Sequence, residues 1–444
     1  MAQASSPTML RGGTVVNDQG QARADVIIAD GLIVDVGSSL EVPTSATVID
    51  ASDTLIFPGL VDLHTHLREP GREEAETVES GARAAALGGY TAVVAMPNTE
   101  PCTDSPEVVR LVLSLAKDAV CDIAVAGAIT IERAGELLSP MAEMASLGVS
   151  LFTDDGSGVQ DGGVMRRALQ YAHGLGLTLA QHCEDNAIAN GGCMHEGMHS
   201  GRLGLPGIPA SAEEAMLARD LLLVAETGAS MHFLHLSTAA SVVMVAQAKK
   251  AGLPVTCEVA PHHLVLTDQA CCGYDPIFKV NPPLRSADDV AGLCKAVLSG
   301  AVEAIATDHA PHPPQAKDLP FDEASPGMLG LETALSLIAG VVVHEGKGSW
   351  SDVVRLLSTN PAKIAKLRAS DPRLGGQSAQ GGSVSPGEVA NLCVFDAQAT
   401  WTASSTDSAS RSANLPYEGW PMQGRVRHTL LRGEAVVLDG QAQR

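Results

Sequence analysis

The chain has 444 residues, of which 45% are hydrophobic and 18% charged, a composition that predicts a folded globular protein and excludes intrinsic disorder. The formal net charge of −22 argues against a nucleic-acid binder and against a role at a membrane surface. The nine cysteines are scattered without a C-x-x-C pair, and no secretory or membrane-spanning run is visible, so we expect reduced thiols and a cytoplasmic location.

The two ends of the chain have the pattern of β structure. In residues 1–58, short β-branched runs alternate with Gly, Asp and Asn turns, without a helical period. Residues 373–444 return to β character in ANLCVFD, GRVRHTLLRG and EAVVLDG, after a Gly/Ser-rich stretch at 375–386 that indicates a loop or linker. Neither end is large enough alone, so we expect one small β-sandwich domain composed of both.

Residues 59–372 alternate β-like runs with Ala-rich helical segments. We expect eight strands, at 60–64, 91–96, 122–128, 149–153, 177–182, 230–235, 254–259 and 303–307. We expect helices at 73–87, 107–119, 164–173, 212–226, 239–250, 287–298, 332–343 and 351–367. Eight such units over roughly 250 residues or more predict a (β/α)8 TIM-type barrel. A doubly wound open sheet is the alternative, but its Gly-rich phosphate turn is replaced here by His64-Thr65-His66.

Polar side chains follow the expected strands at their carboxyl ends, where barrels of this kind carry their active sites. His64 and His66 end the first strand, and alternation places them on one side. Other strand ends carry Met96-Pro97-Asn98, Thr153-Asp154-Asp155, Gln181-His182, Leu234-His235 and Thr307-Asp308. Imidazoles and carboxylates without thiolates suit a catalytic divalent metal, zinc first, with an open position for water. The chemistry that follows is metal-assisted attack of hydroxide on an amide or ester carbonyl.

The motifs DLHTHLREPG, MPNTEP, FTDDGSGVQ, HCEDN, LGLPGIP, HLST, APHHL, NPPLR and ATDHAPH together resemble the bacterial type I dihydroorotases of the amidohydrolase superfamily. The likeness spans nearly the whole chain, and HLREPG and TDHAPH are its most specific pieces. It implies a metal-dependent hydrolase that reversibly opens the cyclic amide of (S)-dihydroorotate to N-carbamoyl-L-aspartate in de novo pyrimidine (UMP) biosynthesis. It implies one or two zinc ions per chain, with two favoured.

The resemblance also implies roles for single residues. The implied metal ligands are His64, His66, Asp155, His182, His235 and Asp308. Asp308 is also the implied catalytic proton shuttle, while metal-bound hydroxide attacks the ring carbonyl. The carbamylated lysine that often bridges two metals in this superfamily has no counterpart, because no lysine occurs between Lys117 and Lys249. Asp155 is the preferred bridging carboxylate and Asp154 the runner-up, since alternation turns only one of them to the metal.

The implied substrate contacts are His66, Arg68, Asn98, Asn281, His312, Pro326 and Gly327. The guanidinium of Arg68 suits the substrate carboxylate. The family often has another residue in place of Pro326, so we expect that contact to involve backbone amide groups.

Six other histidines are interpreted as structural or exposed. His232 is an odd number of positions from His235 and is expected to face the other way. We expect His262, His263 and His309 to be structural, and His195 and His199 to be exposed in the Gly-rich loop 190–207. The acidic stretch 73–79 is expected to begin a helix.

Two alternative functions stay open at this point. One is another cyclic amidohydrolase, an allantoinase or a dihydropyrimidinase-like enzyme, against which Arg68 and the missing strand-four lysine argue. The other is a non-catalytic dihydroorotase-like partner of aspartate transcarbamoylase, against which the intact ligand set argues. We expect a small-molecule substrate and neither nucleic acid nor membrane as a partner. A homodimer and an association with aspartate transcarbamoylase are left open.

Overall fold

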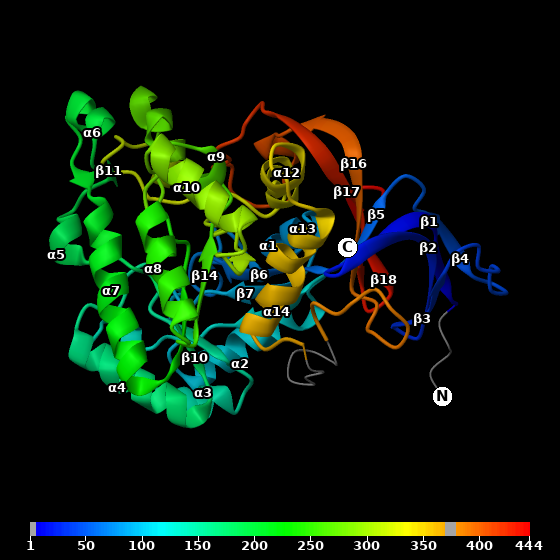
Figure 1. Ribbon diagram of the computed structural model, residues 1–444, viewed down its shortest axis with the longest axis horizontal. Helices are drawn as coiled ribbons and strands as arrows, with labels where there is room; N and C mark the ends of the chain where they lie inside the picture. Colours follow the sequence, from blue (N-terminus) through cyan, green and yellow to red (C-terminus); the bar gives the residue numbers. More distant parts are fainter. Residues whose placement is uncertain (1–5, 369–378) are drawn as a thin grey trace.

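The structure of the protein is a computed structural model that describes residues 6–368 and 379–444. The expected (β/α)8 barrel with a β domain built from both chain ends is confirmed (Figure 1). The expected limit at 58/59 falls between two strands, whereas the limit at 372/373 and the first part of the 375–386 linker lie outside the described residues. The exact domain limits therefore stay a prediction.

Eight parallel strands form the barrel, one in each segment expected to hold one. They are β6 (Leu60–Thr65), β7 (Tyr90–Ala95), β8 (Asp122–Val125), β9 (Leu151–Thr153), β10 (Thr178–Gln181), β13 (Ser230–Phe233), β14 (Val255–Val259) and β15 (Ala304–Ile305). All six residues of β7 are buried, as expected for a strand covered on both faces.

Two single bridges close the ring of strands. The sheets β6-β7-β8 and β9-β10-β13-β14-β15 are joined by the parallel bridges Gly127↔Phe152 and Thr65↔His309. The amide N–H of His66 donates to the carbonyl of His309 at 2.9 Å at the second of these junctions. The first and last strands therefore meet where the polar strand ends gather.

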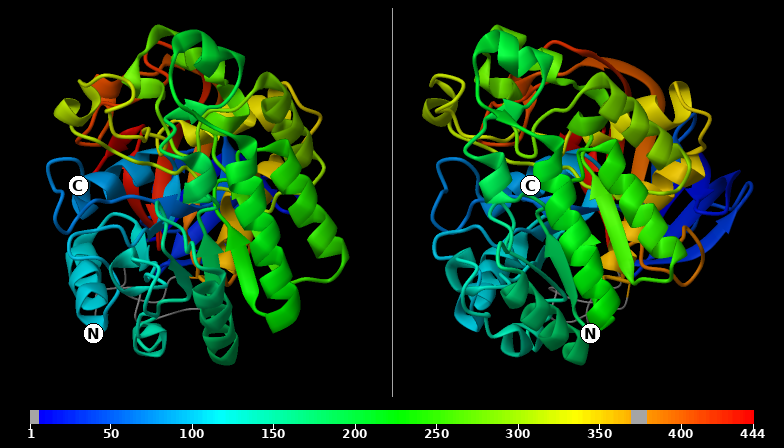
Figure 2. Two further views of the ribbon diagram at one scale, coloured as in Figure 1. Left: turned by 90° about the vertical axis from the view of Figure 1, so that its left-hand side faces the viewer. Right: turned by 60° about the vertical axis from the view of Figure 1, so that its left-hand side comes forward.

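Helices cover the outside of the barrel, as Figures 1 and 2 show for α4, α7, α8 and α10. The helices of the barrel are α1 (Val78–Leu87), α2 (Pro106–Leu115), α3 (Met141–Ala145), α4 (Gly162–Leu175), α7 (Ala210–Thr227), α8 (Ala239–Lys250) and α10 (Ala287–Leu298). They are followed by α12 (Ala334–Ala339), α13 (Trp350–Val354) and α14 (Asn360–Ile364). The π-helical turns Gly340–His344 and Arg355–Thr359 interrupt the two segments expected as single long helices.

The first helix begins later than expected. Thr77 caps α1 by accepting a hydrogen bond from the amide of Ser80 at 3.1 Å, so the helix begins at Val78 and not at residue 73. Glu76 lies before the cap and is fully buried, where it contacts His309 and the segment between β16 and β17. The acidic stretch is thus partly a buried network and not only a helix start.

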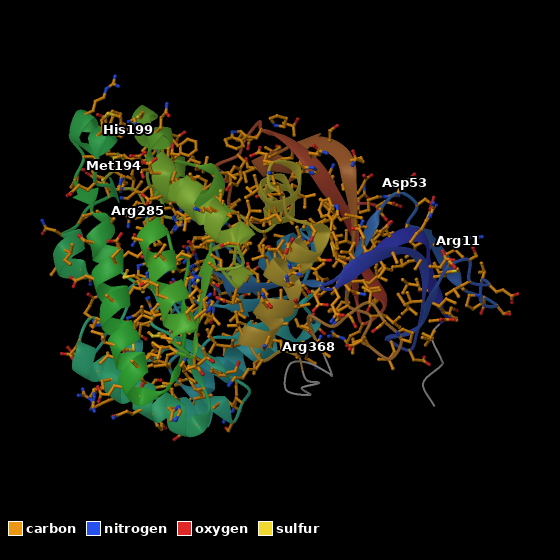
Figure 3. All side chains as sticks on the ribbon, in the orientation of Figure 1. Arg11, Asp53, Met194, His199, Arg285 and Arg368 are labelled. Carbon is orange, nitrogen blue, oxygen red and sulfur yellow. The ribbon has the colours of Figure 1, made fainter. Side chains whose placement is uncertain are left out.

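An insertion extends from the carboxyl end of β10. It contains α5 (Asn186–Ala189), β11 (Met194–His195), α6 (Met198–Leu203) and β12 (Gly207–Ile208). Arg285 lies below Met194 and His199 on the same side of the molecule (Figure 3). Its buried guanidinium donates to the carbonyl of Ile208 at 2.8 Å and so ties the insertion to the barrel. Smaller elements at this end are α9 (His262–Val265), α11 (Pro314–Lys317) and the 3-10 turns Asp268–Gly273 and Pro276–Phe278.

Both chain ends build one nine-stranded sheet, at the right of Figure 1. Its strands are β1 (Thr8–Asn17), β2 (Gly20–Ala29), β3 (Leu32–Gly37), β4 (Thr47–Asp50), β5 (Leu55–Pro58), β16 (Leu392–Thr402), β17 (Pro421–Leu431), β18 (Glu434–Leu438) and β19 (Gln441–Ala442). The antiparallel pair β5–β16 joins the N-terminal to the C-terminal strands, with Ile56 opposite Val394 in a shared apolar core. Within residues 6–368 and 379–444, no helix has both the length and the apolar character needed to cross a membrane.

Candidate active site

The structure brings the six predicted ligands together at the carboxyl ends of five barrel strands. Two groups of ligand atoms, each spanning no more than 4.8 Å, share Asp155: one is His64, His66 and Asp155, the other Asp155, His182 and His235. All five side chains are buried. Asp308 lies beside them, with its Oδ1 3.2 Å from His66 Nε2 and 3.6 Å from His64 Nε2.

The neighbouring aspartates after β9 face different surroundings. Asp154 Oδ1 accepts hydrogen bonds from the amides of Ile129 at 2.8 Å and Thr130 at 3.0 Å. Asp155 instead points into the histidine cluster, with its Oδ2 3.3 Å from His64 Nε2 and its Oδ1 3.3 Å from His235 Nε2. Of the two candidates, only Asp155 therefore has the position of a shared carboxylate ligand.

The donor atoms of this cluster fit a divalent metal ion. His66 Nδ1 lies 2.8 Å from Asn98 Oδ1, so Nδ1 carries the proton and Nε2 faces the cluster with its lone pair. Among the described residues, the buried His64 Nε2 has no hydrogen-bond partner, and the nitrogens of the other two imidazoles that face Asp155 Oδ1 are His182 Nδ1 at 3.6 Å and His235 Nε2 at 3.3 Å. Buried imidazole nitrogens gathered around carboxylates, without thiolates, are ligands that suit a divalent metal ion.

The two cluster carboxylates are held in their charged form. Burial alone would raise the pKa of Asp155, but the charge of His64 and hydrogen bonds from His182 and His235 hold it well below its usual range. Burial likewise opposes ionisation of Asp308, whereas the neighbouring imidazoles of His66 and His64 lower its pKa. Ionised carboxylates are what metal coordination requires.

Glu258, near the end of β14, is a member of this site that the sequence motifs did not single out. Its fully buried carboxylate places Oε1 3.2 Å from His64 Nδ1 and Oε2 3.0 Å from His232 Nε2. Burial would raise its pKa, yet the hydrogen bonds from His232 and His64 lower it to about 2. The sequence did offer one signal that could have identified Glu258: it is a charged residue within the otherwise apolar run VTCEVA.

The expectation that His232 faces away from the site is wrong. β13 ends at Phe233, and His235 has a φ of +30°, so strand alternation does not extend from His232 to His235. His232 is fully buried and shares Glu258 with the cluster, while its Nδ1 lies 2.7 Å from Thr256 Oγ1.

Arg68 lies beside the cluster as a buried cation. It is 6% exposed, and no carboxylate of the described residues lies within ion-pair distance of it. Its Nε donates to the carbonyl of Pro311 at 3.1 Å, and its Nη2 lies 3.3 Å from His312 Nε2. Burial and the charge of Arg72 lower its pKa to about 10, so it remains cationic at neutral pH. A buried guanidinium without an acidic partner is a strong candidate for binding an anionic ligand.

His312 and the segment Pro326–Gly327 pack against one another. His312 Nε2 donates to the carbonyl of Pro326 at 2.8 Å, and burial together with the charge of Arg68 lowers the pKa of His312 to about 3. Gly327 has a φ of +144°, and a Cβ there would come within 2.9 Å of His312 Cδ2. Pro326 has no N–H, and the Gly327 N–H donates to the carbonyl of Lys279, so the expected contact through their backbone amides lacks a free donor.

Asn281 lies on the loop before α10. Its Nδ2 lies 3.4 Å from Glu184 Oε1, and its buried Oδ1 has no hydrogen-bond partner among the described residues. This free acceptor is consistent with the predicted contact to a substrate N–H, which stays a prediction.

Five further histidines, outside the two ligand groups, divide into structural and partly buried ones. His309 is buried between Glu76 and the amide of Gly330, in agreement with its structural interpretation. His262 and His263 begin the short helix α9 and do not lie on a strand, and neither belongs to the two ligand groups. The expected exposure of His195 and His199 is wrong, because His195 Nδ1 lies 3.3 Å from Arg285 Nη1 and His199 Nδ1 lies 3.1 Å from Cys272 Sγ.

Comparisons with known proteins agree with this architecture. A family described as Dihydro-orotase-like matches residues 53–241. Curated relatives include the dihydroorotase of Mycobacterium tuberculosis, 46% identical over 94% of this chain and 96% of the relative. The dihydroorotase of Streptomyces coelicolor is 45% identical over 98% of this chain and 99% of the relative.

Solved structures share the fold at lower sequence identity. The L-hydantoinase (dihydropyrimidinase) from Arthrobacter aurescens has a TM-score of 0.87 at 23% identity, covering 98% of this chain and 97% of that one. The dihydropyrimidinase from Brevibacillus agri has a TM-score of 0.85 at 25% identity, covering 98% and 96%.

Proposed function

The chain belongs to the dihydroorotase family of cyclic-amide hydrolases, and from this we propose how its site binds and opens dihydroorotate. The observation that carries the proposal is the position of Arg68. This buried guanidinium lacks an acidic partner among the described residues and adjoins the histidine and aspartate cluster. A ligand that carries a carboxylate next to a hydrolysable ring amide matches both features.

The metal ligands of the proposal are His64, His66, Asp155, His182, His235 and Asp308. Zinc is the proposed ion, with two per chain, because two ligand groups share the carboxylate of Asp155. A divalent ion bound there supplies Lewis acidity toward the ring carbonyl and lowers the pKa of a water to about 7.

Asp308 is the proposed proton carrier. It is 4% exposed, and its Oδ1 lies 3.2 Å from His66 Nε2 at the edge of the ligand cluster. It takes a proton from the attacking water as the new carbon–oxygen bond forms. It then returns that proton to the ring nitrogen as the carbon–nitrogen bond breaks, so the products are a ureido group and a new carboxylic acid, which loses the second proton of the water to solvent and becomes a carboxylate.

The substrate is proposed to bind at the carboxyl end of the barrel, on the side of Arg68 and His312. Arg68 binds the carboxylate, and His312 next to it remains a proposed substrate contact. Asn98 accepts the hydrogen bond of His66 Nδ1 and so fixes the orientation of that ring. Asn98 and Asn281 also remain proposed substrate contacts. Pro326 and Gly327 provide no free amide donor, so their proposed contact with the substrate is one of backbone shape: the segment packs closely against His312 and forms part of the pocket wall.

A substrate panel tests this proposal. Zinc-loaded protein is given dihydroorotate, allantoin and dihydrouracil, and turnover of each is followed. We expect dihydroorotate to be hydrolysed and the two others to be poor substrates, because neither of them places a carboxylate on Arg68. Turnover of allantoin without turnover of dihydroorotate would contradict the proposal.

Inactive but folded protein that holds no metal would favour a structural partner of aspartate transcarbamoylase. Whether the chain forms homodimers or associates with that enzyme is checked on the same sample by measuring its mass in solution with and without the transcarbamoylase.

A further inference from the structure

The segment between β16 and β17 leaves the terminal sheet and reaches the barrel end that carries the site. Glu76 accepts a hydrogen bond from the amide of Arg411 at 3.1 Å, and Ser412 Oγ donates to the carbonyl of Ala75 at 2.8 Å. The same segment contains Asn414, which is 2% exposed. A residue remote from the barrel in sequence is thereby buried next to the substrate side of the mouth.

The side chain of Asn414 connects two loops. Its Oδ1 accepts from the amide N–H of His312 at 3.1 Å. Its Nδ2 donates to the carbonyl of Ala310 at 2.9 Å and to that of Gly327 at 3.0 Å. Its own carbonyl accepts from the amide of Leu329 at 3.0 Å. One carboxamide therefore satisfies backbone groups on both sides of the predicted substrate contacts.

These two loops have little freedom to shift without changing the site. The tight approach of Gly327 to His312 fixes their separation, and His312 Nε2 already donates to Pro326. Arg68 is held by the carbonyl of Pro311, which lies between the two residues that Asn414 binds. A displacement of residues 310–312 would therefore move both the imidazole of His312 and the anchor of the guanidinium.

We propose that Asn414 is a positioning residue for substrate binding, which holds His312 and the Pro311 carbonyl so that Arg68 meets the substrate carboxylate. The proposal rests on the proposed function, since it assumes that this pocket binds dihydroorotate. It also gives the C-terminal part of the chain a direct role in the active site of the barrel. Asn414 itself contacts the loops and not the reacting atoms.

The chemistry of the amide makes the proposal specific. Aspartate has nearly the same shape, but its second oxygen would face the carbonyls of Ala310 and Gly327 in place of an N–H donor. Two donated hydrogen bonds would be lost, and negative charge would face two carbonyl oxygens in a buried place. Because the carboxylate anchor is remote from the reacting carbonyl, the loss is expected in KM more than in kcat.

The test compares zinc-loaded wild type, Asn414→Asp, Asn414→Ser and the control Ser412→Ala. The control removes a hydrogen bond of the same segment without touching His312 or Gly327. For Asn414→Asp we expect KM for dihydroorotate to rise about tenfold or more, kcat to change less than about threefold, and zinc per chain to stay at the wild-type value. Ser412→Ala should keep KM within about twofold of wild type.

Each other result decides against the proposal in its own way. An unchanged KM in Asn414→Asp, or an equal rise in Ser412→Ala, would overturn it. Should Asn414→Asp fail to fold, Asn414→Ser carries the same comparison, and an unchanged KM there would overturn it too. Wild type without activity on dihydroorotate would overturn the proposed function as well, so the two failures are distinguished by the wild-type measurement.

Discussion

The carboxylate of Glu258 lies 3.2 Å from Nδ1 of His64, on the side of the imidazole that faces away from Asp155. This contact assigns the proton of His64 to Nδ1 and leaves Nε2 for the cluster. Glu258 thus orients a predicted metal ligand, while its other oxygen is bound by His232.

The first prediction concerns Glu258→Gln. The variant keeps the shape of the side chain but removes the charge that supports His64 and His232, so zinc affinity should fall about 10- to 100-fold. Chelator competition measures this directly. Glu303→Gln is the matched control. Glu303 lies outside the cluster, where its carboxylate pairs with Lys249 Nζ at 2.5 Å, so this variant should leave the zinc affinity unchanged. Equal affinity in wild type and Glu258→Gln would contradict the orienting role.

The second prediction separates the two aspartates after β9. Asp155→Asn removes the carboxylate shared by both ligand groups, so bound zinc per chain should drop clearly below that of wild type. Asp154→Asn should keep its zinc but lower the melting temperature, because Asp154 accepts two buried backbone amides. Metal analysis and thermal unfolding of both variants check this pair, and the reverse pattern would exchange their assigned roles.

The third prediction concerns proton transfer. Asp308→Asn should keep zinc largely bound through the remaining ligands while turnover of dihydroorotate falls by about 100-fold or more. Steady-state kinetics with metal content measured on the same sample provides the check. Turnover near the wild-type rate would exclude Asp308 as the proton carrier.

The fourth prediction concerns the buried cation. Arg68→Met should raise KM for dihydroorotate by about 100-fold or more, because the charged hydrogen bonds to the carboxylate are lost. Arg72→Met serves as the control, since Arg72 pairs with Glu100 at 2.6 Å on the surface and should have little effect. A similar KM in both variants would remove Arg68 from the carboxylate site.

The fifth prediction concerns stability against pH. Lys317 is buried, and burial with the charge of Lys279 lowers its pKa from the ordinary 10.5 to about 7. Between these pH values the unfolded chain binds more protons at this group than the folded protein. The free energy of unfolding therefore rises with pH there, by at most about 1.4 kcal/mol per pH unit.

Lys317→Met should flatten that rise. The melting temperatures of wild type, Lys317→Met and the exposed control Lys295→Met are compared at pH 7 and pH 9. The melting temperatures of wild type and Lys295→Met should rise more between pH 7 and pH 9 than the melting temperature of Lys317→Met. An equal rise of the melting temperature in all three proteins would show that Lys317 does not titrate between pH 7 and pH 9.

Much of the barrel was predictable because its signals are local. Each strand is a short apolar run, and polar residues follow at its carboxyl end, so His64, His182 and Asp308 could be placed from their positions alone. The union of both chain ends in one β domain was also inferable, since neither end could bury a core by itself, whereas the pairing of β5 with β16 was not.

The contacts that the sequence did not predict are between distant segments. Glu258 meets His64 only because the fold closes the ring, and 194 positions separate the two. Asn414 contacts His312 from a loop in which no sequence motif indicated a role in the site. Alternation also failed beyond the strand ends, where positive φ values at His235 and Asp308 turn the chain sharply.

The cluster around Asp155 is proposed to hold zinc and to open the ring of dihydroorotate. The most direct measurement is a titration of chelator-treated, metal-free protein with zinc, following dihydroorotate hydrolysis at each step. We expect no turnover without metal and activity that rises with zinc and saturates near two ions per chain. Full turnover in metal-free protein, or none in zinc-saturated protein, would contradict the claim.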